Sequence, residues 1–249
     1  DLIIYYKLYY SFRKFTREVF QSSKMGEEVT LLGSWYSPYA RRVELALRLK
    51  GIDFNYVEEN LLAKSSLLLQ SNPIYKKVPV LIYNGKPIAE SLIILHFIEE
   101  MWPSAYPLLP SDPFARAKAI FWAHFVDDDK ILRTGFRGLM GTGEQFDHAA
   151  EDIRGQLEFL ENELRGKEFF GEERIGYLDI VAFFVMYWLE AWEEVAGKVI
   201  IPYDKFPVIT RWMERVRNDD TVLMCLPDRD RLVAHYRTRF AKFLPAGSH

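Results

Sequence analysis

The spacing of hydrophobic residues changes near residue 102 and divides the chain into two parts. Before that point, short apolar runs of strand length alternate with stripes that have the spacing of a helix. The predicted strands are Val29–Leu32, a run through Phe54, Tyr56 and Val57, Val80–Tyr83 and Lys86–Ala89, and the predicted helices run from Ser37 to Lys50, Lys64 to Leu69 and Glu90 to Met101. This order of elements predicts a small α/β domain.

Short sequence signals mark the ends of these elements. Ser37-Pro38 is typical of a helix start, with serine as the N-cap and proline in the first turn. Gly51 suits a left-handed stop at the end of that helix. Asn84-Gly85 between two apolar runs predicts a β-hairpin, because both turn residues must adopt a positive φ.

A proline-rich segment separates this domain from a second one. Pro103, Pro107 and Pro110 exclude a regular helix and indicate a linker. Beyond it no strand pattern remains, and helical stripes cover Ile153–Leu164 and a segment through Ile180 and Trp188 that is apolar nearly all round. Further helix starts are predicted at Asp112-Pro113, Phe206-Pro207 and Asp228. We therefore expect an extension over residues 1–26, an α/β domain over 27–102, a linker over 103–112 and an all-helical domain over 113–249.

Composition restricts the function. The chain has 249 residues, of which 49% are hydrophobic, and its net charge of −3 gives no basic surface for nucleic acid. No apolar run approaches the roughly 18 residues that cross a bilayer. The single cysteine, Cys225, excludes a disulfide framework and suits a reducing compartment, so we expect a cytoplasmic protein.

The first 24 residues carry five basic and two acidic side chains. Lys7, Arg13, Lys14 and Arg17 interrupt every apolar run, which argues against a secretion signal. We expect this extension to be poorly ordered and to take no part in the fold.

The sequence does not support a metal site or a nucleotide-binding site. The histidines His96, His124, His148, His235 and His249 lack metal-ligand spacing, and Asp127–Asp129 is typical of a solvated or structural run. Gly138, Gly141 and Gly143 do not form a nucleotide-binding fingerprint. We expect no metal site.

Five segments, taken together, resemble one family. They are Gly33–Tyr39 (GSWYSPY), Asn72–Leu81 (NPIYKKVPVL), Asn84–Pro87 (NGKP), Glu90–Leu92 (ESL) and Ile175–Ile180 (IGYLDI). Their order over residues 27–243 resembles the glutathione S-transferase superfamily, and closely its plant tau class. The resemblance implies a thioredoxin-like N-terminal domain that binds glutathione, an all-α C-terminal domain that forms most of the pocket for a hydrophobic electrophile, and a homodimer. It implies glutathione as co-substrate and no further cofactor.

The resemblance also assigns roles to single residues. Ser37 would activate the thiol. The glutathione contacts would be Arg42, Lys64, Lys77, Val78, Glu90 and Ser91, whereas Lys76 is expected to be solvated. The Val78-Pro79 peptide would be cis and would offer its backbone to the cysteinyl residue of glutathione. Glu90 and Ser91, at a helix start, would match the ammonium and carboxylate of the γ-glutamyl group.

The chemistry agrees with a serine in this place. A cysteinyl thiol has a pKa of about 8.5, and lowering it by about two units corresponds to roughly 2.7 kcal/mol. A hydrogen bond to a charged acceptor contributes about 1.5–3 kcal/mol, and a helix N-terminus about 0.3–1 kcal/mol. One hydroxyl at the start of a helix can therefore supply the shift, although the same hydroxyl is also expected to cap that helix.

The resemblance gives the remaining candidates structural or pocket roles. Gly176 and Asp179 match half of a capping box at the start of the buried helix, which we assign to folding. Ile131 and Gly135 stand where tau-class relatives often carry tyrosine and arginine. We therefore expect a more apolar and roomier acceptor pocket, bordered by Trp35, Tyr39, Ile131, Gly135 and Trp188.

Two functions remain open. The chain is either an enzyme that conjugates glutathione to electrophiles, with reduction of organic hydroperoxides as a second activity, or a carrier whose apolar pocket holds a hydrophobic ligand. Ser37 and the expected glutathione contacts favour the enzyme. A disulfide reductase relative would need cysteine at position 37.

Overall fold

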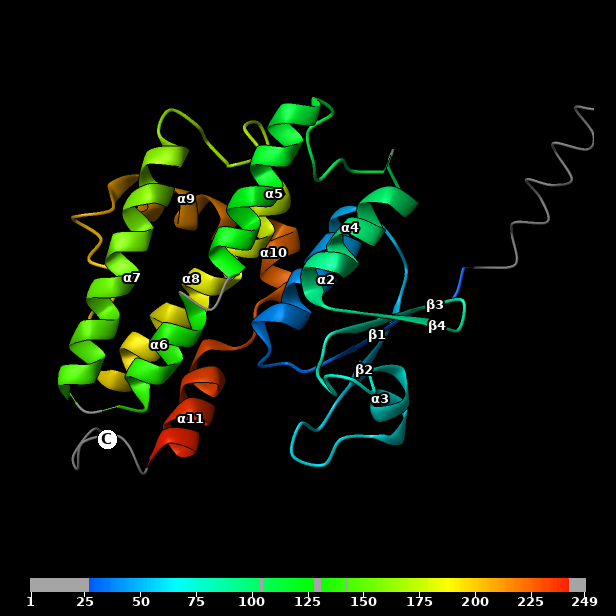
Figure 1. Cartoon of the computed structure of the whole chain (residues 1–249), viewed down its shortest axis with the longest axis horizontal. Helices are drawn as coiled ribbons and strands as arrows, with labels where there is room; N and C mark the ends of the chain where they lie inside the picture. The colour runs from blue at the N-terminus through cyan, green and yellow to red at the C-terminus, as the bar shows by residue number, and fades with distance from the viewer. Residues whose placement is uncertain (1–26, 104, 128–130, 142, 242–249) are drawn as a thin grey trace, which may run out of the picture.

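A computed structural model describes residues 27–241 except 104, 128–130 and 142. The predicted extension over residues 1–26 and the acidic pair Asp128 and Asp129 lie outside the described residues. Figure 1 shows a sheet-containing part and an all-helical part that meet along the helices α2 and α8.

The first part is the predicted α/β unit. Its elements are β1 (Val29–Gly33), α2 (Pro38–Leu49), β2 (Asn55–Glu58), α3 (Ser66–Ser71), β3 (Val80–Tyr83), β4 (Lys86–Ala89) and α4 (Ser91–Met101). The sheet has the order β2-β1-β3-β4, in which β1 is parallel to β2 and antiparallel to β3, and β3 is antiparallel to β4. The predicted α/β fold with a hairpin is confirmed.

Side chains that alternate along β1 divide between the two faces of the sheet. Leu31 joins the large core with α2 and α4, whereas Leu32 packs with Leu68 of α3 in a smaller cluster on the other face. The sheet therefore has helices on both faces, and the face with α2 and α4 is turned toward the helical part (Figure 1).

The sequence signals take the expected backbone shapes. Asn84 and Gly85 have φ of 47° and 77°, as the hairpin requires, and Gly51 ends α2 with a φ of 66°. The Val78-Pro79 peptide is cis, as expected.

The second part consists of helices. They are α5 (Pro113–Asp127), α6 (Leu132–Leu139), α7 (Gly143–Leu164), α8 (Tyr177–Ala196), α9 (Pro207–Arg217), α10 (Asp220–Cys225) and α11 (Arg229–Phe240). Helix α8 is buried almost all round and contacts α2, α5, α6, α9 and α11, which confirms its predicted central place.

An internal ion pair fixes the joint between the two parts. Lys50, at the end of α2, pairs with Glu99 of α4 at 2.7 Å and also donates to two linker carbonyls. Glu99 accepts the backbone N–H groups of Leu108 and Leu109. The hydroxyl of Tyr177 on α8 donates to the carbonyl of Leu92 on α4 at 3.0 Å. These contacts hold the helical part against the sheet part.

Asp179 stabilises the start of α8. The predicted half of a capping box is present, because its carboxylate accepts the N–H of Gly176 at 2.8 Å. It also accepts the N–H groups of Phe170 and Gly171, each at 2.8 Å, and the indole N–H of Trp212 at 2.7 Å. Burial raises its pKa to about 6, against the lowering effect of these four donors.

Candidate active site

Ser37 lies between β1 and the first residue of α2. Its φ and ψ of −97° and 113° are those of an N-cap, and its buried Oγ accepts the N–H of Ala40 at 3.3 Å. A hydroxyl has one donor and two acceptor positions. Capping uses an acceptor position and leaves the O–H free to donate, so helix capping and thiol activation do not compete for this side chain.

A cavity of about 490 Å³ opens beside Ser37, between the sheet part and the helical part. The sheet part contributes Tyr36, Ser37, Pro38, Tyr39, Leu61, Lys64, Lys76, Lys77 and Val78; the helical part contributes Leu132, Arg133, Phe136, Trp188, Trp192, Tyr236 and Arg239. The first group forms the sheet-side wall and the second the helical wall. Ser37, Tyr39, Lys64, Lys77, Val78 and Trp188 are therefore brought together as predicted.

Positive charge dominates this cavity. Five of the lining side chains are cationic and, among the described lining residues, none is a carboxylate. The cations are Lys64, Lys76, Lys77, Arg133 and Arg239. The cavity therefore favours an anionic ligand. Lys76, which the sequence predicted to be merely solvated, lies in this wall with a φ of 55°.

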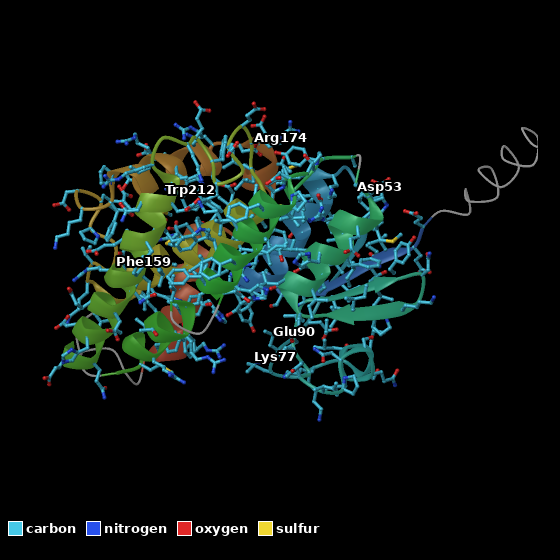
Figure 2. The ribbon with its side chains drawn as sticks, turned by 45° about the horizontal axis from the view of Figure 1, so that its top comes forward. Asp53, Lys77, Glu90, Phe159, Arg174 and Trp212 are labelled. Atoms are coloured by element: carbon cyan, nitrogen blue, oxygen red, sulfur yellow. The ribbon has the colours of Figure 1, made fainter. Side chains whose placement is uncertain are left out.

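Glu90 and Ser91 stand at the start of α4 and do not line the cavity. Glu90 is exposed and has a φ of 72°, a strained value for a residue with a side chain, and it makes no capping hydrogen bond. Figure 2 labels Glu90 and Lys77 on the part of the molecule that carries the sheet. The first N–H groups of α4 can bind a carboxylate there.

Arg42 is not part of the cavity wall, contrary to its predicted contact with glutathione. The side chain is fully buried, and its Nη1 forms an ion pair with Asp127 of α5 and donates to Ser91 Oγ at 3.4 Å. Its guanidinium also lies over the ring of Tyr39 at 5.0 Å. Its Nε and Nη2 atoms are buried without a hydrogen-bond partner among the described residues. Arg42 contacts Ser91 and Tyr39 from the core side of α2 and does not reach the cavity.

Two further predicted pocket residues, Ile131 at the N-cap of α6 and Gly135 within that helix, also lie elsewhere. Ile131 is fully buried in the core. Gly135 faces α8, where an added Cβ would meet Leu189 at 2.7 Å and Trp192 at 3.3 Å. Gly135 therefore lets α6 approach α8 closely. A larger side chain at this position would require Leu189 and Trp192 to move.

Trp35 packs beside the cavity. Its ring lies 4.0 Å below the Arg231 guanidinium and 5.5 Å from the imidazole of His235 on α11. The neighbouring Tyr36 does line the cavity and stacks on His235 at 4.2 Å. The loop before Ser37 is thus held against the last described helix.

The helical wall is aromatic and hydrogen-bonded. Trp188 Nε1 donates to the hydroxyl of Tyr236 at 2.9 Å, and burial raises the pKa of Tyr236 to about 12. Tyr236 meets Trp192 edge to face at 5.7 Å. A fixed aromatic wall of this kind suits a flat or apolar ligand.

The sequence did not predict most residues of the helical wall, and it also missed four residues of the sheet-side wall. The missed lining residues are Tyr36, Pro38, Leu61, Lys76, Leu132, Arg133, Phe136, Trp192, Tyr236 and Arg239. A usable signal existed in the spacing, because Arg133 and Phe136, Trp188 and Trp192, and Tyr236 and Arg239 are three or four residues apart and share helix faces.

Neither metal nor membrane features were found in the part of the chain that the structure describes. No three His, Cys, Asp or Glu side chains there are placed to hold a metal ion. No described helix combines the length and the apolar character needed to span a membrane.

Comparison with known proteins decides the family. Residues 27–100 match the model of the glutathione S-transferase N-terminal domain, and residues 119–220 match that of the C-terminal domain. The chain is 45% identical to glutathione S-transferase U7 of Arabidopsis thaliana over 87% of its own length and 94% of that protein. The chain belongs to the tau class of the glutathione S-transferase family. This membership confirms the predicted fold and the predicted type of enzyme.

Further glutathione transferases agree. Glutathione transferase GST 23 of Zea mays is 44% identical over 88% of this chain and 98% of its own. The crystal structure of the tau-class enzyme of mango, Mangifera indica, is 39% identical, with a TM-score of 0.77 over 85% of this chain and 98% of that one. Rice GST1, solved in complex with glutathione, is 33% identical, with a TM-score of 0.81 over 88% of this chain and 98% of that one.

Proposed function

We propose that this transferase conjugates reduced glutathione to hydrophobic electrophiles and that the Ser37 hydroxyl stabilises the thiolate. The observation that carries the proposal is the state of that hydroxyl. It is buried at the N-terminus of α2, its acceptor position is used by Ala40, and its proton is free to point into a cation-lined cavity.

The expected gain matches what the chemistry needs. The O–H to sulfur hydrogen bond contributes about 1.5–3 kcal/mol and the helix end about 0.3–1 kcal/mol. Together they lower the thiol pKa by about two units, at 1.36 kcal/mol per unit. The thiolate sulfur then forms a bond to the electrophilic carbon, and the leaving group departs with its electron pair.

The charged and polar groups near Ser37 suggest how the other parts of glutathione bind. Lys64 and Lys77 bind the glycyl carboxylate, and the backbone of Val78 pairs with the cysteinyl residue as an added strand. Glu90 accepts the γ-glutamyl ammonium, while Ser91 and the start of α4 hold the γ-glutamyl carboxylate. Glutathione is the co-substrate, and no other cofactor takes part. With a hydroperoxide, two glutathione molecules give the disulfide, an alcohol and water.

Exposed apolar side chains support the homodimer. Ile93 on α4 is 57% exposed, and Phe114 and Phe121 on α5 are 80% and 60% exposed. Large exposed apolar side chains on these two helices, which follow each other in the chain, are consistent with a surface that a second copy covers. A cytoplasmic location remains a prediction.

The experiment that tests the proposal compares wild type with Ser37→Ala. Losing a hydrogen bond worth about 1.5–3 kcal/mol lowers kcat/KM roughly ten- to hundredfold toward 1-chloro-2,4-dinitrobenzene. Ultraviolet titration of the bound thiol should show its pKa rising toward about 8.5. Asp219→Ala, which removes the N-cap of α10, controls for a lost helix cap. An unchanged thiol pKa in Ser37→Ala contradicts the mechanism.

A carrier function is the second candidate, and the aromatic helical wall favours it. In that case wild type and Ser37→Ala would be equally slow with every electrophile, while hydrophobic dyes would quench the fluorescence of Trp188 and Trp192 at similar concentrations in both proteins.

A further inference from the structure

The cavity holds more positive charge than glutathione uses. Bound glutathione with an ionised thiol has two carboxylates and a thiolate against one ammonium. Lys64 and Lys77 bind one carboxylate under the proposed function, and the other lies at α4, outside the cavity wall. Lys76 and Arg239 are left over, and Arg239 comes from the helical wall.

Both arginines of the helical wall line the cavity together with Phe136. Arg133 and Phe136 are three residues apart on α6 and so share a face of that helix. Arg239 of α11 lies over the Phe136 ring, 5.9 Å from its centroid. Arg239 forms no ion pair with any residue that the structure describes, so its charge has no protein counterion there.

The surroundings of these arginines are aromatic. Trp188, Trp192 and Tyr236 line the same helical wall, and a lining carboxylate that would repel an anion is absent from the described residues. A guanidinium presents a planar fork of N–H donors that fits a carboxylate with two parallel hydrogen bonds. The wall thus combines an apolar surface with an anion-binding edge.

We infer that the second substrate is an amphipathic anion, with an aromatic or apolar body against Trp188 and Trp192 and a carboxylate held by Arg239. This inference rests on the proposed function and adds the class of electrophile to it. It also differs from the expectation of a more apolar pocket, because the cation absent at Gly135 is supplied from α6 and α11 at other positions.

The experiment uses the full chain, saturating glutathione and two acceptors with the same leaving group. One is 1-chloro-2,4-dinitrobenzene, and the other is 4-chloro-3,5-dinitrobenzoate, which adds a carboxylate. In both, sulfur bonds to the ring carbon that carries chlorine, chloride leaves with the bonding pair, and the thiol proton passes to solvent. Saturating glutathione keeps Lys64 and Lys77 occupied.

The measured quantity is the ratio of kcat/KM for the benzoate to that for the neutral acceptor. Arg239→Gln should lower this ratio about tenfold, mainly through the KM for the benzoate. Arg239→Lys keeps the charge and should retain part of the preference. Arg237→Gln is the matched control, since it removes one charge from an exposed position of the same helix that does not line the cavity.

The outcomes separate the two proposals. A ratio in Arg239→Gln within about twofold of wild type overturns the anion site and leaves the transferase function standing. If wild type conjugates neither acceptor, the proposed function fails, and binding of the benzoate then decides the inference. Quenching of tryptophan fluorescence should show about tenfold weaker binding in Arg239→Gln, and equal binding in the two proteins contradicts the inference.

Discussion

The sheet-side and helical walls of the cavity are built in different ways. On the sheet side, Ser37 and Val78 lie in turns whose shape is set by a neighbouring proline. On the helical side, α6, α8 and α11 are distant in sequence and meet only through packing. The comparison teaches that the proposed thiol chemistry depends on short local signals, whereas the proposed choice of the second substrate depends on how helices pack.

The largest expected effect comes from removing the Asp179 carboxylate, which supports the start of α8 and therefore the helical wall. Asp179→Ala leaves four N–H donors without their acceptor. The donors of Gly176 and Trp212 are buried, and an unsatisfied buried donor costs about 1–3 kcal/mol, so we expect a loss of at least about 2 kcal/mol, a large part of the stability of a domain. Urea unfolding followed by circular dichroism measures it.

Asp152→Ala is the control for that loss. Asp152 is exposed on α7, and a surface substitution there should change the unfolding free energy by less than about 0.5 kcal/mol. If Asp179→Ala were as stable as this control, the carboxylate would not hold the start of α8.

An effect of intermediate size on stability is expected from comparing alanine substitutions at two glycines, one of which lies where α6 packs on α8. Gly135→Ala places a methyl group 2.7 Å from Leu189, so we expect a net loss of about 1–2 kcal/mol despite the better helix propensity of alanine. Gly155→Ala, in α7, meets nothing within 4 Å and should gain about 0.5–1 kcal/mol. Thermal unfolding of the two variants should move in opposite directions, and a gain in both would show that α6 is loosely packed.

The smallest effect concerns His235, where the two walls touch. Burial lowers its pKa, and the charges of Arg239 and Arg231 lower it further; Tyr36, Trp35 and Tyr236 are its ring neighbours. The folded state therefore favours neutral imidazole, and this part of the stability is complete above an unfolded pKa of 6.5 and is lost as the pH falls.

His235→Phe keeps the ring stack and removes the titration. The unfolding free energy of wild type should fall more steeply than that of the variant between about pH 7 and 5. Parallel curves would show that this imidazole does not contribute to the acid sensitivity.

Local signals explain what the sequence could predict. Ser-Pro, Asn-Gly and the apolar runs gave the α/β part, its hairpin and the place of Ser37, because each signal limits the backbone over a few residues. The resemblance added the cis peptide before Pro79 and the lysines at 64 and 77. Helix starts at Asp112-Pro113 and Asp228 were visible for the same reason.

The rest depends on contacts between distant residues. Helix α6 was missed because Gly135 and Gly138 lower its intrinsic propensity, and packing on α8 decides its shape. Arg42 was assigned to the ligand because its burial against Asp127 on α5 cannot be read from spacing. The arginines of the helical wall were missed because three separate helices must be in place before their side chains share one space.

The stack of Tyr36 on His235 has a consequence for the order in which the enzyme matures. Ser37 is synthesised early, whereas α11, which completes the cavity around it, is the last described helix to be made. A nascent chain halted before α11 therefore contains Ser37 and the sheet-side wall but lacks Tyr236 and Arg239, so its cavity stays open on that side.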